Sequence, residues 1–327
     1  MRPRQREWGA AVSPGDARGG RVAPPGIAPP AVWAVGSGKG GVGKSVIAAN
    51  LAVALARAGV AVALVDADLG GANLHTLLGI GPPRKTLADF LHRRVKRLEE
   101  VMVPGGVASL WLISGAGALL ETASPNAGQK GKILRHMGTL PVEVVLLDLG
   151  AGSSLPVLDF FLAARRSLVV VVPEPTSIEN TYQFLRAAFF RKLRQAEPRD
   201  RIQEVVSAVM AGGGERRPHS PRELLAAAAA YDPEVGAALA REAQAFRPGV
   251  VVNQTRTEEQ RRLAEDVAQA CRDYFGSAVE ALGALDYDPL VGLAVQQRRP
   301  VAEAYPETPF VRQLRAVHRH LAELPGE

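Results

Sequence analysis

Short apolar runs alternate with helix-forming stretches along most of the chain. The apolar runs cover residues 31–35, 60–65, 110–114, 142–148, 168–172, 249–252 and 279–285. Helical spacing or helix-forming composition marks residues 46–57, 86–98, 126–137, 178–194 and 263–275. Continuous apolar strands are typical of a parallel sheet that helices cover on both faces. The alternation therefore predicts an α/β fold with one doubly wound, mostly parallel sheet.

Length and composition allow one such domain. The chain has 327 residues, of which 47% are hydrophobic, enough for one large α/β domain or two small ones. No run approaches the roughly 18 apolar residues of a membrane span, and a cytoplasmic protein is expected. Residues 1–30 hold five Arg, six Pro and five Gly and lack the apolar segment of a signal peptide. They predict a disordered basic arm, either simply solvated or in contact with an anionic partner, before a domain at 31–327.

A glycine-rich loop follows the first apolar run and precedes a helix-forming segment. Residues 38–45 match the phosphate-loop pattern G-x-x-x-x-G-K-[ST]. Glycines let backbone N–H groups turn toward phosphates, Lys44 can reach the β- and γ-phosphates, and Ser45 can offer its hydroxyl to Mg²⁺. The strand before the loop and the helix after it make a chance glycine-rich turn the weaker interpretation. The predicted nucleotide-binding residues of the loop are Gly38, Lys39, Gly40, Gly41, Val42, Gly43, Lys44, Ser45 and Val46.

Polar residues stand at the carboxyl ends of three other apolar runs. Asp66 and Asp68 follow the run 60–65, Asp148 ends the run 142–148, and Asn253 follows the run 249–252. In a doubly wound sheet these ends face the ligand crevice. An Asp at a strand end is typical of the carboxylate that holds Mg²⁺ or its water shell, so Asp148 joins Ser45 as a predicted metal residue. A turn or cap role is the alternative for Asp66, Asp68 and Asn253.

Together these segments resemble the MinD/ParA family of ATPases, whose phosphate loop carries a second lysine. The resemblance rests on residues 39–45, 66–73, 148–152, 173–177 and 253–254. It implies a P-loop fold of the SIMIBI type and a Lys39 that reaches across a dimer interface to phosphates held by the partner subunit. It also implies that Asp68 orients the attacking water or the metal shell, that Asp66 supports the loop, and that Asn253 contacts adenine. Residues 66–79 are most similar to the flagellar-placement branch, FlhG (also called YlxH).

Three further features bear on the function. The single cysteine, Cys271, argues against relatives that carry iron–sulfur clusters, since these need several thiolates. Residues 195–247 are expected to form a helical insertion. Residues 309–324 predict a basic amphipathic helix that either docks on the sheet, which we favour, or contacts a membrane. The helix predicted over 86–98 presents Arg and Lys side chains outward, either to solvent or to an acidic partner.

The combined expectation is a Mg²⁺-dependent ATPase of low turnover that forms a homodimer with ATP. Its expected catalytic residues are Lys39, Lys44 and Asp68. As a switch it would regulate flagellum number or organise a cell pole or division site. The expected partner is a flagellar SRP-type GTPase or another stimulator, together with ATP-dependent contact with an anionic membrane. One alternative is a ParA-like partition ATPase that binds DNA, suggested by the net charge of +6 and the pI near 9.7. The other is a nucleotide-dependent scaffold with little turnover.

Overall fold

The apolar runs form the strands of one sheet. The computed structural model describes residues 28–68, 70–116, 127–196, 198–211, 218 and 220–323, and within these an eight-stranded sheet has the order β3-β4-β2-β5-β1-β6-β7-β8. The strands are β1 Ala31–Gly36, β2 Val62–Ala67, β3 Val103–Pro104, β4 Leu110–Ile113, β5 Val144–Leu149, β6 Arg166–Val171, β7 Gly249–Thr255 and β8 Glu280–Asp286. All neighbours pair in parallel except β3 and β4. The predicted single, mostly parallel α/β sheet is confirmed.

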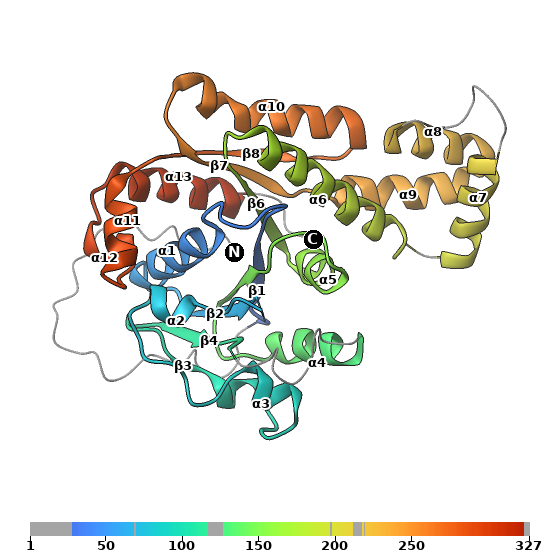
Figure 1. Ribbon diagram of the computed structural model, residues 1–327. Coiled ribbons are helices and arrows are strands. Elements are labelled where there is room, and N and C mark those ends of the chain that lie inside the picture. Colours follow the sequence, from blue (N-terminus) through green and yellow to red (C-terminus); the bar gives the residue numbers. More distant parts are fainter. Residues whose placement is uncertain are drawn as a thin grey trace.

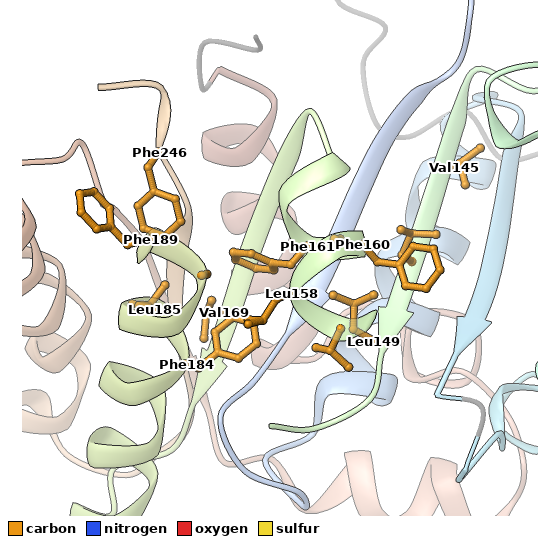
Figure 2. Packing of buried hydrophobic residues seen from close by; sticks show 14 of the residues in the cluster. Val145, Leu149, Leu158, Phe160, Phe161, Val169, Phe184, Leu185, Phe189 and Phe246 are labelled. Carbon is orange, nitrogen blue, oxygen red and sulfur yellow. The ribbon is translucent and has the colours of Figure 1, made fainter. Parts of the chain in front are cut away.

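Helices cover both faces of the sheet (Figure 1). They are α1 Lys44–Arg57, α2 Leu74–Leu77, α3 Leu87–Leu91, α4 Ala127–Met137, α5 Leu155–Ala163, α6 Pro175–Leu193, α7 Arg199–Ala211, α8 Pro221–Tyr231, α9 Pro233–Ala245, α10 Glu258–Phe275, α11 Pro289–Gln296, α12 Val301–Ala304 and α13 Pro309–Glu323. Alternate residues of each strand join different clusters, so the sheet separates two cores. One core contains side chains of α4, α5, α6 and α10; Figure 2 shows Phe161 of α5 beside Phe184 of α6, with Phe160 on the side of Leu149 in β5. The other contains α1, α12 and α13.

The segment after β2 corrects one prediction. A continuous helix over 86–98 is wrong, because α3 ends at Leu91 and Arg93 takes a left-handed conformation with φ of 60°. A short 3-10 helix, Leu98–Val101, follows the turn. Val95 and Leu98 are nevertheless buried. The apolar spacing was therefore a sound guide to burial and a poor guide to backbone conformation.

The peripheral segments take the following positions. In Figure 1, α7, α8 and α9 lie together at one end of the molecule beyond α6, within the segment expected to be a helical insertion. The apolar stripe of α13 is almost completely buried against β8 and α1, so this helix docks on the sheet. Its stripe consists of Phe310, Val311, Leu314, Val317 and Leu321. The described residues include no helix long and apolar enough to cross a membrane. Residues 1–27 of the basic arm, residues 212–217 of the insertion and Leu324 lie outside the described residues.

Candidate nucleotide site

The glycine-rich loop connects the end of β1 to the start of α1 at the centre of the sheet. Since β5 and β6 flank β1, the loop lies where the strand order reverses, the usual ligand position in such sheets. A Cβ atom at Gly38 would lie 2.1 Å from the backbone oxygen of Asn180 in α6. Gly41 and Gly43 have φ of 79° and 91°, conformations that favour glycine. The loop thus has little freedom, and Lys44 at its end is only 7% exposed.

Asn253 supports the loop from β7. Its side chain is 6% exposed, and Nδ2 donates a hydrogen bond of 2.9 Å to the backbone oxygen of Val42. A Cβ at Gly43 would lie 2.4 Å from the same Nδ2 atom. The structure thus places one hydrogen-bonding group of Asn253 on the loop itself, whereas the resemblance implied contact with adenine; that contact stays a prediction.

Two buried carboxylates lie side by side at the carboxyl edge of the sheet. Asp66 of β2 and Asp148 of β5 are register partners and each is 1% exposed. Burial, reinforced by the neighbouring carboxylates, raises the pKa of Asp66 to about 7. Burial also raises the pKa of Asp148 to about 6, although the charge of Lys44 and a hydrogen bond from Ser45 oppose it. Among the described residues the Oδ1 atom of each carboxylate has no hydrogen-bond partner.

Asp68 lies against the loop that follows β5. Its Oδ1 atom accepts a hydrogen bond of 3.1 Å from the backbone of Gly71 and would lie 3.5 Å from a Cβ at Gly150. The backbone N–H of Gly152 in turn donates to the oxygen of Ser37 at 2.9 Å. Asp68, the segment after Asp148 and the phosphate loop therefore form one contiguous set of loops.

Lys39 occupies the outer side of the phosphate loop. Its side chain is 39% exposed, and Nζ lies 3.0 Å from Oε2 of Glu174 and 3.2 Å from Oγ1 of Thr176, both at the start of α6. The second lysine is therefore held by its own chain at the surface rather than directed into the site. Neither Glu174 nor Thr176 was predicted as a site residue, although both lie in the segment 173–177 that contributed to the resemblance.

Comparison with known proteins agrees with this geometry. Residues 33–301 match the model of the CobQ/CobB/MinD/ParA nucleotide binding domain. The chain belongs to this family. The chain is 30% identical over 306 residues to the antiactivator FleN of Pseudomonas aeruginosa, a match that covers 91% of this chain and 88% of FleN. It is 33% identical over 167 residues to the flagellum site-determining protein YlxH of Helicobacter pylori, covering 47% of this chain and 52% of YlxH.

A solved structure of this MinD/ParA fold also superposes on the chain. The septum site-determining protein MinD of Pyrococcus horikoshii, complexed with Mg-ADP, gives a TM-score of 0.57 at 19% identity and covers 90% of this chain and 96% of that one. At this identity the likeness concerns the fold. The suitability of the site for a nucleotide and a metal must be judged from this chain's own residues.

The residues of this family member fit Mg²⁺. Ser45 lies close enough to Asp148 to oppose the rise of its pKa, and the Oδ1 atom of Asp148 is buried without a hydrogen-bond partner in the described part of the chain. The described residues contain no group of three or more His, Cys, Asp or Glu side chains placed to hold a metal ion. Mg²⁺ commonly takes one or two protein oxygens and completes its shell with phosphates and waters. Ser45 and Asp148 therefore suit a metal that arrives with a nucleotide.

Proposed function

We propose that this chain is a Mg²⁺-dependent ATPase that dimerises with ATP and regulates the number or placement of flagella. The family supports the ATPase, and the similarity to YlxH, a flagellum site-determining protein, supports the flagellar role. The observation that carries the switch is the surface position of Lys39, which its own chain holds through Glu174. An exposed cation on the rim of a phosphate loop can reach the phosphates of a second subunit once that ion pair opens.

The chemistry follows from positioning and charge neutralisation. Lys44 is buried at the start of α1, where its ammonium group and the helix N-terminus attract phosphate oxygens. Ser45 and Asp148 would hold Mg²⁺, which would supply positive charge at the phosphates. Asp68 lies beside the loop after β5 and is the candidate for orienting the attacking water. The Lys39 of a partner subunit would add a further positive charge, so that hydrolysis depends on the dimer.

The test is the mass of the protein in solution, measured by light scattering with ADP and with ATP. We expect the wild type to dimerise with ATP but not with ADP. The ATP-bound dimer should persist in Asp68→Ala and should not form in Lys39→Ala. Lys96→Ala is the matched control, because Lys96 is an exposed lysine in the turn after α3. A mass that does not depend on the nucleotide in the wild type contradicts the switch. Dimerisation without phosphate release would instead identify a scaffold.

A second candidate function is non-specific DNA binding, as in a partition ATPase. The segment around α3 exposes six cations, two before the helix and four in the turn after it, and two of the six pair with carboxylates, in Arg94–Asp89 and Arg97–Glu99. The others form no ion pair with the described residues; they are Arg84, Lys85, Arg93 and Lys96. Contacts to phosphates would make duplex affinity fall steeply with salt. A charge-reversed Arg93→Glu, Lys96→Glu variant that keeps the wild-type duplex affinity would exclude this surface.

A further inference from the structure

Asp286 forms a hydrogen-bond hub at the carboxyl end of β8. Arg261 of α10 donates to both carboxylate oxygens, from Nε at 2.8 Å and from a terminal nitrogen at 3.0 Å. Thr255 of β7 donates its hydroxyl at 2.7 Å, and Gln313 of α13 donates its amide at 2.8 Å. These hydrogen bonds, that of Arg261 above all, hold the pKa of Asp286 near 2. One charged carboxylate therefore ties two strands to two helices.

The hub fixes an irregular end of β7. Gln254 is not glycine yet has φ of 62°, and the register between β7 and β8 shifts between Asn253 and Thr255. A left-handed non-glycine residue is strained and persists only where surrounding contacts enforce it. Thr255 supplies such contacts on the far side of the shift, since its hydroxyl binds Asp286 and its backbone oxygen accepts from Tyr287 at 2.8 Å. Bulges of this kind are common beside functional sites, where they redirect a side chain.

The residue next to the bulge contacts the phosphate loop. Asn253 immediately precedes the strained residue, and its Nδ2 atom donates to the Val42 oxygen at 2.9 Å. The loop passes so close that Gly43 could not carry a Cβ without meeting this amide. A small movement of the end of β7 would therefore displace Val42 and Gly43, and with them the start of α1 at Lys44.

We propose that Asp286 is a positioning residue for the phosphate loop. By holding the bulged end of β7 it keeps the Asn253 amide on Val42, and this contact holds the loop in the conformation that binds phosphates. The inference rests on the proposed function only in taking a nucleoside diphosphate as the ligand. It does not depend on dimerisation, hydrolysis or the cellular role.

The test compares Asp286→Asn with wild type by isothermal titration, using Mg·ADP and, as a phosphate-only probe, Mg·diphosphate. We expect the affinities for both ligands to fall by about tenfold, the equivalent of one well-placed hydrogen bond. Asp232→Asn is the matched control, because Asp232 also pairs with an arginine, Arg201, but lies in the α7–α9 segment. It should leave both affinities unchanged.

A double-mutant cycle with Asn253→Ala shows whether the effect passes through the loop contact. In the Asn253→Ala background, Asp286→Asn should cause little further loss of affinity. Full additivity of the two losses would overturn the proposal. A loss of affinity of Asp286→Asn for Mg·ADP alone would also overturn the proposal, because it would mean that Asp286 shapes a base-binding segment. A lower Tm of Asp286→Asn with unchanged affinities for both ligands would overturn it too.

Failure of the proposed function gives a different pattern. A wild type that binds Mg·ADP without dimerising in ATP would contradict the switch, while the cycle would still decide the role of Asp286. A wild type that binds neither Mg·ADP nor Mg·diphosphate would overturn both.

Discussion

Replacing Gly38 with alanine tests how tightly the phosphate loop is packed against α6. An added Cβ would lie 2.1 Å from the backbone oxygen of Asn180, 2.3 Å from its carbonyl carbon and 2.7 Å from the nitrogen of Thr181. These are backbone atoms within a helix, so no side-chain rotation can relieve the contact. Gly38 is not among the residues with positive φ, and the effect of the substitution is therefore one of space alone.

The magnitude follows from what must move. To restore ordinary contact distances, the loop and α6 must separate by roughly 1 Å. The helix cannot move freely, because Phe184 and Leu185, which follow the contact in α6, are almost fully buried. Overpacking of this kind costs about 1–3 kcal/mol. For a domain of this size each kcal/mol lowers Tm by roughly 2–4 °C. We therefore expect Gly38→Ala to lower Tm by roughly 2–12 °C.

The assay is thermal unfolding without nucleotide, so that ligand affinity does not enter. Gly40→Ala is the control, because Gly40 lies in the same loop, a Cβ there meets nothing within 4 Å, and its φ is not positive. Its Tm should stay at the wild-type value or rise slightly, since alanine restricts the unfolded chain. Equal Tm values for the two variants would refute the packing that we describe between the loop and α6.

Three further outcomes are expected. The pKa values of Asp66 and Asp148 are raised to about 7 and about 6, so the folded protein binds more protons than the unfolded chain between about pH 4 and pH 7. The contribution of these two groups to stability is therefore present at low pH and lost as the pH rises through this window. The Tm of the wild type minus that of Asp66→Asn, measured without nucleotide, should fall with pH across the window, and a constant difference would contradict the raised pKa. Leu314→Ala should lower the free energy of unfolding, measured in urea, by about 2–5 kcal/mol. Arg319→Ala, on the exposed side of α13, should change it little, and equally small effects of both substitutions would mean that α13 is not docked. Asp159→Asn removes the carboxylate that pairs with cations of α4 and α6. It should lower the free energy of unfolding in urea by about 1–3 kcal/mol, and an unchanged unfolding midpoint would show that these ion pairs do not contribute to stability.

Sequence predicted the central fold well where a pattern had one physical meaning. Uninterrupted apolar runs such as 144–147 are buried on both faces, so their burial and their strand conformation follow from the same cause. The strand β3 was missed because it has two residues, one of them Pro104, and lies at the edge of the sheet. Proline is tolerated at such an edge, but nothing in a two-residue segment distinguishes a strand from a turn.

The segment 86–98 shows where periodicity fails. Apolar residues at helical spacing require only that the side chains reach the core, and Val95 and Leu98 do so in the structure. The left-handed turn at Arg93 achieves the same burial with a different backbone path. An arginine gives no local signal of positive φ, as glycine or asparagine would, so the break could not be predicted.

For the nucleotide site, the sequence identified which residues gather but not what each of their polar groups binds. An asparagine at a strand end was predicted from the chemistry of its amide, which has both a donor and an acceptor. In the fold one donor of Asn253 is bound to Val42, 211 residues away, and Lys39 is bound to Glu174, 135 residues away. Such partners meet only because β7 and α6 lie against the loop, and no local pattern encodes that meeting. A hydrogen-bonding group that the fold has already bound must be released before it can contact a ligand. The contribution of either residue to nucleotide binding is therefore the difference between its contact in the free protein and its contact in the complex.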